Sequence, residues 1–180
     1  MAKDFDIFNG GIKNMREYVE EQKNNLKVYE EQMLEQAQNN LLDNIKVNSN
    51  NITASGVGMD SDGIRELEYT AQEVANSNEI EKVSSRHIKI RNTSEEATYA
   101  EFGTGIIGKG TPYPNNALQW EYDVNSHGER GWRYIGRSGK LVRTQGYPAY
   151  ATYYNSFEDL KKDLDSISKE TFKGVFTNED

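Results

Sequence analysis

Apolar side chains recur every three, four or seven positions through the first 46 residues, and this spacing constrains the fold more than any other feature of the chain. Residues spaced in this way share one face of an α-helix, because the helix completes a turn in ~3.6 residues. The sequence therefore predicts a long helix over about residues 8–46, with Asn9 as its N-cap. The predicted stripe consists of Phe8, Ile12, Met15, Val19, Leu26, Tyr29, Met33, Ala37, Leu41 and Ile45.

A helix of this length reaches roughly 54 Å at ~1.5 Å per residue, which exceeds the width of a small domain. We therefore expect either a break near Asn39 and Asn40, or a projecting end that packs on a neighbouring molecule. Asparagine and serine favour turns, so the segment VNSNN at residues 47–51 is expected to end the helix.

Alternating apolar and polar residues predict strands in the middle of the chain, because successive side chains of a strand point to opposite faces. The alternation is clear at residues 87–91 and clearest at 118–124, where the apolar positions are Leu118, Trp120, Tyr122 and Val124. Residues 64–75 favour a short helix, although a strand fits nearly as well.

Two further strands are predicted at residues 132–135 and 140–144, with a tight turn at 136–139 between them. Together with residues 118–124 they form a predicted three-stranded antiparallel meander. The sheet core is expected to occupy about residues 47–146.

The chain ends in a predicted amphipathic helix over about residues 148–175, with Pro148 in its first turn. The order of helix, strands and helix predicts an α+β fold. In this fold a small antiparallel sheet packs against the long N-terminal helix and the C-terminal helix. The length of 180 residues fits a single domain.

Composition narrows the possible functions. The net charge of −8 disfavours a dedicated nucleic-acid binder, which needs a cationic surface. The chain has no cysteine and only two histidines, His87 and His127, neither of which lies in a pattern expected of a general base. We therefore expect no metal, no cofactor, no membrane span and no enzymatic activity. The hydrophobic content of 35% is low, so part of the apolar surface is expected to be buried against copies or partners.

Charge is unevenly distributed along the sequence. Residues 104–155 contain six basic and three acidic residues, while the rest of the chain has a net charge of −11. Two interpretations remain open. The basic residues could form a solvated strand face, or they could meet the acidic helices of a neighbouring subunit and so close a ring.

A glycine-rich segment at residues 103–111 contains G-x-G-x-x-G and nearly matches the phosphate-binding pattern G-x-x-x-x-G-K-[ST]. Gly110 stands where that pattern needs serine or threonine, and Pro112 follows where a helix should begin. A nucleotide-dependent enzyme is therefore a remote alternative. The favoured interpretation is a mobile glycine loop that becomes ordered against a partner.

Aromatic residues are concentrated near the end of the chain, and two interpretations remain open here as well. They could form a sugar-stacking platform, as in a cell-wall-binding module, or pack in the core and at interfaces. The packing interpretation is favoured, with Trp120 and Trp132 supporting the sheet. The cluster consists of Trp120, Tyr122, Trp132, Tyr134, Tyr147, Tyr150, Tyr153 and Tyr154.

The run TYAEFGTG at residues 98–105 resembles the "YA…EFGTG" signature of the head–tail joining proteins of long-tailed bacteriophages. These are often labelled neck, tail-completion or phage morphogenesis proteins. Gly131-Trp132, the run TQGYPA at residues 144–149 and the amphipathic stretch 156–172 follow in the order found in that family. The resemblance covers residues 98–175, and the long N-terminal helix agrees in layout.

The resemblance implies a structural virion protein without catalysis, made in the host cytoplasm and located at the head–tail junction. Copies would form a ring between the head-closure layer and the tail, contacting other connector and tail proteins. Packaged DNA would pass through the ring without sequence-specific binding. The residues expected at interfaces are Tyr99, Ala100, Glu101, Phe102, Gly103, Thr104, Gly105, Gly108, Gly110, Trp132, Gly146 and Pro148.

One expected consequence concerns the glycines of this signature. Replacing Gly103 or Gly105 by valine is expected to leave the subunit folded while blocking the joining of head and tail. The alternative to the connector function is a carbohydrate-binding module that uses the aromatic cluster.

Overall fold

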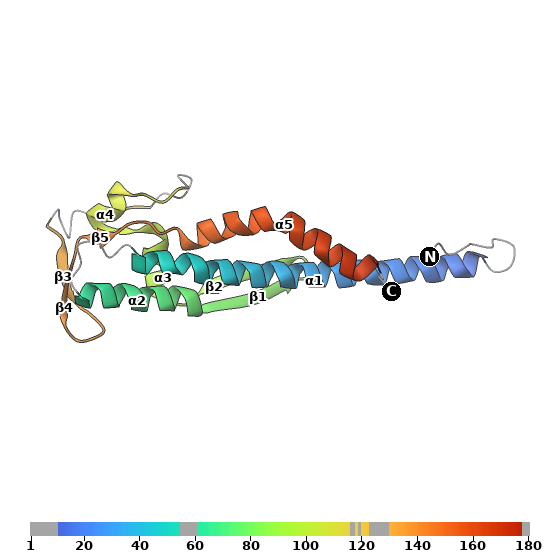
Figure 1. Cartoon of the computed structure of the whole chain (residues 1–180), viewed down its shortest axis with the longest axis horizontal. Helices are drawn as coiled ribbons and strands as arrows, with labels where there is room; N and C mark the ends of the chain where they lie inside the picture. The colour runs from blue at the N-terminus through green and yellow to red at the C-terminus, as the bar shows by residue number, and fades with distance from the viewer. Residues whose placement is uncertain (1–10, 55–60, 116–117, 119, 123–129, 178–180) are drawn as a thin grey trace.

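The computed structural model describes residues 11–54, 61–115, 118, 120–122 and 130–177, with side chains from Asn14 onward. Two long helices lie side by side (Figure 1). Most of the shorter helices and strands gather around one end of the pair, while one pair of strands runs along the long helices. The long helices are α1 (Gly11–Ala54) and α5 (Thr152–Phe176).

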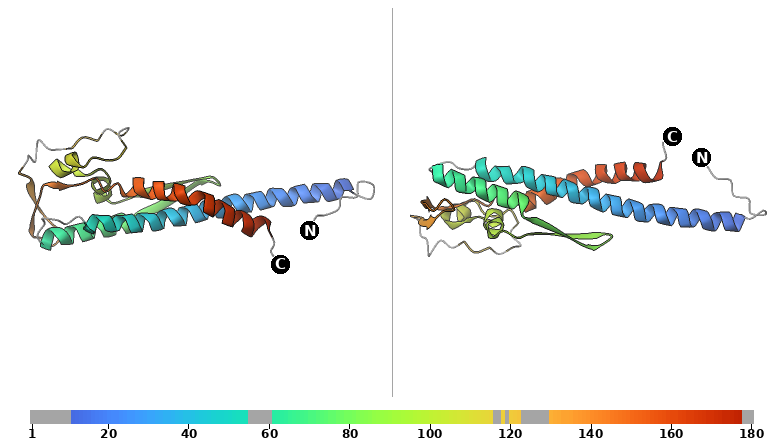
Figure 2. Two further views of the ribbon diagram at one scale, coloured as in Figure 1. Left: turned by 45° about the horizontal axis from the view of Figure 1, so that its top comes forward. Right: turned by 90° about the horizontal axis from the view of Figure 1, so that it is seen from below.

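Helices α1 and α5 run antiparallel. Near the end of α5, the hydroxyl groups of Tyr29 and Ser168 share a hydrogen bond of 2.8 Å. Near its start, Asn48 Nδ2 donates to Ser156 Oγ at 3.1 Å. Residue numbers therefore rise along α1 as they fall along α5. The N-terminal part of α1 extends past the end of α5 (Figures 1 and 2).

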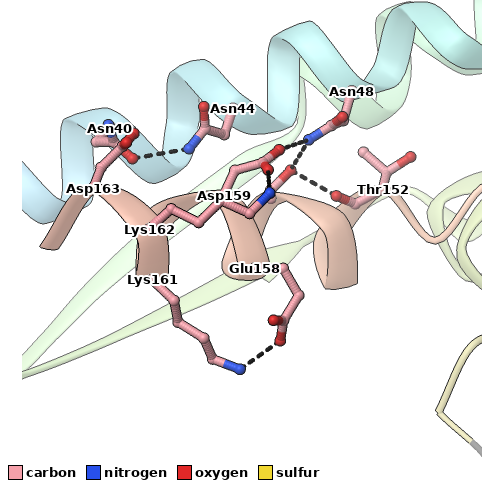
Figure 3. Close-up of polar contacts among 10 residues, drawn as sticks. Asn40, Asn44, Asn48, Thr152, Glu158, Asp159, Lys161, Lys162 and Asp163 are labelled. Atoms are coloured by element: carbon pink, nitrogen blue, oxygen red, sulfur yellow. Dashed lines mark hydrogen bonds and ion pairs between the residues drawn. The ribbon is translucent and has the colours of Figure 1, made fainter.

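The predicted end of the first helix is wrong, because α1 continues to Ala54. Of the two alternatives, the break near Asn39 and Asn40 is not found, and the N-terminal end of α1 projects instead (Figure 1). The asparagines that indicate turns find partners on α5 (Figure 3). Asn40 Nδ2 donates to Asp163 at 3.0 Å, and Asn48 Nδ2 also donates to Asp159 at 3.2 Å. Ile52 is fully buried, which holds the last turns of α1 in place.

The predicted helix over residues 64–75 is confirmed as α2 (Ser61–Asn76). It packs on the C-terminal part of α1, and Leu67 and Val74 are buried between them and the neighbouring elements. This packing forms the hydrophobic core, whose buried members are Ile52, Leu67, Ala71, Val74, Ala97, Ala100 and Tyr150. The predicted sheet core therefore starts too early, because residues 47–54 and 61–76 are helical.

The strands form two separate antiparallel pairs. Strand β1 (Asn78–Ser84) pairs with β2 (His87–Asn92), as the alternation at residues 87–91 predicts for β2. Strand β3 (Trp132–Ile135) pairs with β4 (Leu141–Thr144), which confirms the predicted hairpin. The short strand β5 (Gly146–Tyr147) follows β4.

The predicted three-stranded meander is wrong, because Leu118, Trp120 and Tyr122 lie outside regular strands. Val124 lies outside the described residues. The side chains of Trp120 and Tyr122 are held by other parts of the chain. Trp120 Nε1 donates to the carbonyl of Gly103 at 3.1 Å, and the hydroxyl oxygen of Tyr122 accepts the N–H of Tyr113 at 3.2 Å.

Two short helices complete the fold: α3 (Glu95–Phe102) and α4 (Gly105–Gly110). The C-terminal helix begins at Thr152, so Pro148 precedes it and is not in its first turn. The α+β class is confirmed, with a long N-terminal helix packed against a long C-terminal helix and small antiparallel sheets beside them.

None of the described helices is both long and apolar enough to cross a bilayer.

Candidate functional site

The two segments that carry the family resemblance lie far apart in the sequence but meet in space. Thr104 pairs with Tyr147, and Gly105 pairs with Gly146, in isolated antiparallel bridges. The contact continues along the chain, because the N–H of Tyr150 donates to the carbonyl of Ala100 at 2.9 Å. We call this contact between residues 99–105 and 144–154 the motif junction.

Within the motif junction, Glu101 binds the first turn of α5. Its carboxylate accepts the N–H of Tyr153 at 2.8 Å and the N–H of Tyr154 at 3.0 Å. The first N–H groups of a helix have no partner within the helix, and the positive end of the helix dipole favours an anion there. Ala151, which stands where a capping side chain usually lies, has φ 50 and supplies no cap. Glu101 performs that role.

The charge of Glu101 is largely buried. Burial raises the pKa of this carboxyl, and the hydrogen bonds from Tyr153, Tyr154 and the Tyr113 hydroxyl oppose the rise. Burial, followed by the negative charge of Glu101, raises the pKa of Tyr113 to about 12. The carboxyl group of Glu101 therefore accepts three hydrogen bonds, and its position gives it a structural role.

Glycine is required at two crossing points of the motif junction. Gly103 has φ 78, and a Cβ there would lie 2.6 Å from the backbone nitrogen of Ala149. Gly146 has φ 92, and a Cβ there would lie 1.9 Å from the carbonyl oxygen of Thr104. The expectation that valine at Gly103 leaves the subunit folded is therefore wrong, because the side chain would meet the subunit's own backbone. The same holds for Gly105, where a Cβ would lie 2.5 Å from the carbonyl oxygen of Gln145.

Aromatic rings cover the outer side of this junction. Phe102 stacks on Trp120 with ring centroids 4.8 Å apart, and Tyr113 lies at the same distance from Phe102. The edge of Tyr154 meets Tyr113 at 5.6 Å. Trp120 therefore packs against α3, and the expectation that it supports the sheet is wrong. Trp132, by contrast, begins β3.

The glycine-rich segment is not the loop that the sequence predicts. Residues 105–110 form α4, in which Gly105 and Gly108 are buried. The ring of Tyr122 would lie 3.0 Å from a Cβ at Gly108, while Gly110 has no atom within 4 Å of that position. The first residues of α4 are therefore packed against other parts of the chain, whereas there is free space around Gly110 at its end.

The remaining predicted site residues take different positions. Ala100 is fully buried in the core, whereas Tyr99 is 46% exposed. Pro148 is half-buried in the segment before α5. Thr104 Oγ1 is buried and has no hydrogen-bond partner among the described residues.

A cavity of about 560 Å³ lies beside the motif junction. Residues of α2, α3, β3 and β4 contribute to its wall. Six aromatic residues line it, five of which belong to the aromatic cluster of the sequence: Tyr99, Trp120, Tyr122, Trp132, Tyr134 and Tyr147. Tyr150, Tyr153 and Tyr154 lie elsewhere; Tyr150 is in the core.

An arginine that no sequence motif indicates organises the edge of this cavity. Arg137 donates to Glu73 at 3.1 Å and to Glu96 at 2.6 Å, and its backbone N–H donates to Glu66 at 2.9 Å. Its guanidinium centre lies 5.7 Å from the ring centroid of Tyr69. Burial alone would raise the pKa of Glu96, but the hydrogen bonds from Arg137 and Ser94 lower it.

Basic residues of the β3–β4 hairpin therefore meet acidic residues of the same chain. Besides Arg137, Lys140 Nζ lies 3.1 Å from Asp62. The basic segment and the acidic segments seen in the sequence thus attract one another within one chain, and the ion pairs of Arg137 and Lys140 hold the hairpin against α2 and α3. An acidic partner from a neighbouring subunit is not needed to explain them.

The described residues include no group of three or more histidine, cysteine, aspartate or glutamate side chains placed to hold a metal ion. His87 is exposed in β2, and His127 lies outside the described residues. Comparison of the chain with protein-family models, with curated proteins and with solved structures finds no match in any of the three.

Proposed function

We propose that this chain is a structural subunit of the connector between head and tail in a long-tailed bacteriophage. The observation that carries the proposal is the motif junction. The segments 98–105 and 144–149, on which the resemblance rests, interlock through two bridges and the capping of α5 by Glu101. Residues that resemble a family signature thus act together to set the angle between α3, α4 and α5.

In this proposal the subunit works by assembly and carries out no reaction. Copies form a ring that joins the head-closure layer to the tail, and the exposed Tyr99 and the open end of α4 at Gly110 contact other subunits. The net charge of −8 favours passage of packaged DNA, because like charge keeps the DNA from adhering to the ring.

A stop codon early in the gene tests this proposal in a tailed phage that encodes the chain. Electron microscopy of the lysate is expected to show DNA-filled heads and complete tails that are not joined. The wild-type chain supplied from a plasmid restores joined particles, while the Gly146→Ala chain does not. Joined, infectious particles without the chain would contradict the proposal.

A carbohydrate-binding module is the second candidate, and one observation favours it. The cavity beside the motif junction places Trp120, Trp132 and Tyr147 around a space of about 560 Å³, together with the carboxylates of Glu95 and Glu121. Aromatic faces with polar groups at the edge suit a sugar ring. Titration with cell-wall glycan fragments would change tryptophan fluorescence if this candidate is correct. No change up to millimolar glycan would exclude it.

A further inference from the structure

The N-terminal part of α1 presents an apolar face that no other described helix or strand covers. We call residues 14–28 of α1, which precede its contact with the end of α5 at Tyr29, the arm. All side chains from Asn14 to Glu21 are exposed. Among the apolar ones, Met15 is 50%, Val19 45% and Leu26 52% exposed. Half-exposed apolar residues at helical spacing are typical of a helix that packs on a partner.

This face continues the one that α5 covers. Met15, Val19, Gln22, Leu26 and Tyr29 alternate in steps of four and three, which places them along one side of the helix. Tyr29 of α1 lies beside the C-terminal end of α5. The ring centroid of Tyr29 is 6.2 Å from the ring centroids of Phe172 and Phe176. The arm therefore extends the α1–α5 interface without the helix that covers it elsewhere.

The direction of α5 indicates which helix fits. Because α5 runs antiparallel to α1 and ends before the arm (Figure 2), a helix that continues the line of α5 in the same direction also runs antiparallel to α1. The arm of a second copy meets this condition under a two-fold axis at Gln22. Gln22 then faces its own copy, Val19 faces Leu26, and Met15 approaches Tyr29 and the exposed ring of Phe172.

Charges along one edge of the apolar face fit the same register. This edge carries Arg16, Glu20, Lys23, Lys27 and Glu30. In the antiparallel pair Glu20 faces Lys27, twice by symmetry. Arg16 lies near Glu30, whose carboxylate already accepts a hydrogen bond from Arg86 of its own chain at 2.9 Å. Of the charged residues on this edge, only Lys23 faces its own copy. A parallel pair would instead place this edge opposite largely uncharged residues.

We propose that two free copies of the chain associate through their arms as an antiparallel helix pair, with Gln22 at the two-fold axis. A polar residue at one core position of such a pair fixes its register. The contact does not depend on the proposed function, because it concerns the free protein.

Sedimentation of the purified full chain tests the association. The wild-type protein is expected at twice the 20.5 kDa of one chain, and Leu26→Glu at a single chain. The control Glu35→Lys changes the opposite side of α1 and is expected to remain dimeric. Circular dichroism confirms that each variant is folded. A wild-type protein that is monomeric at all concentrations, or that sediments as a larger ring, would overturn the proposal.

Charge reversal tests the register. Glu20→Lys and Lys27→Glu each place like charges opposite one another twice, and each is expected to weaken dimerisation about tenfold. An equimolar mixture of the two variants places opposite charges at both contacts between positions 20 and 27, so its affinity is expected to return to that of the wild type. A mixture as weak as its components would contradict the register.

Disulfide formation tests the orientation, and the absence of native cysteine makes it unambiguous. A disulfide needs Cβ atoms within about 4.5 Å. Val19→Cys and Leu26→Cys are expected to cross-link when mixed but not when oxidised separately. Asn24→Cys, on the opposite side of the helix, is the control and is expected to stay uncross-linked. Cross-linking of Val19→Cys with itself would indicate a parallel pair and overturn the proposal.

Discussion

Glu101 and Tyr153 are 52 positions apart, yet the carboxylate of Glu101 accepts the backbone N–H of Tyr153 at 2.8 Å. The side chain at the end of α3 thus caps the first turn of α5. A few residues before α5, Tyr147 and Gly146 form bridges with Thr104 and Gly105. The cap and these bridges together fix α5 relative to α3 and α4. The family-like signature therefore has an internal structural role in this chain.

Removal of the cap is expected to destabilise the subunit. Glu101→Ala leaves two N–H groups of α5 without their acceptor, and the free energy of unfolding should fall by about 2–3 kcal/mol. Urea denaturation followed by circular dichroism measures the change. Glu95→Ala, at an exposed position of the same helix, is the control, and a loss of similar size there would contradict the capping role.

The pH dependence of stability should differ in sign between Glu101 and Glu96. The raised pKa of Glu101 means that its contribution to stability decreases as the pH rises above the ordinary glutamate value. The lowered pKa of Glu96 means that its contribution is present above that value and is lost as the pH falls through its folded pKa.

Unfolding of the glutamine variants between about pH 3 and pH 7 measures this difference. As the pH rises, the wild type should lose stability relative to Glu101→Gln and gain stability relative to Glu96→Gln. If the stability difference from the wild type changed with pH in the same direction for both variants, burial would not raise the pKa of Glu101 while Arg137 lowers that of Glu96.

Alanine substitutions at two glycines with positive φ distinguish the cost of backbone strain from the cost of a steric clash. Gly139 has φ 77 and open space around it, whereas a Cβ at Gly146 would meet Thr104. Gly139→Ala is expected to cost about 1 kcal/mol, from the conformation alone. Gly146→Ala adds the clash and should prevent the motif junction from closing, with a loss several-fold larger. Equal losses in thermal unfolding would show that the junction tolerates the added atom.

The polar contact between the long helices offers a further test. Asn48→Ala removes hydrogen bonds to Ser156 and Asp159 and should lower the free energy of unfolding by about 1–2 kcal/mol. Asn50→Ala, at an exposed position of the same helix, should change it little. A small effect of Asn48→Ala in urea denaturation would mean that apolar packing alone holds α1 to α5.

The sequence predicts the long helices well because their apolar stripes are local patterns. It does not predict where α1 ends, because Asn40 and Asn48 indicate turns until the partners on α5 are known. The alternation at residues 118–124 is misleading for a similar reason. Trp120 and Tyr122 are held by Gly103 and Tyr113, which the strand pattern does not include.

The motif junction could be predicted only in part. The resemblance predicts Glu101, Gly103 and Gly146 at interfaces with other subunits, whereas in the structure they make contacts within the chain. These contacts join segments about forty positions apart, and no periodicity reveals them. The one local signal is the presence of glycines in both segments, since close backbone approach favours glycine. Arg137 belongs to the basic segment that the sequence reveals, but its acidic partners come from α2 and α3 and have no local signal.

Electron cryomicroscopy of tailed particles from a phage that encodes this chain tests the proposed function most directly. The antiparallel pair of α1 and α5 is expected to fit density repeated around the axis at the junction between head and tail, with the motif junction of each copy near its neighbour. Density that excludes this pair from the junction, or its presence elsewhere in the particle, would contradict the proposal.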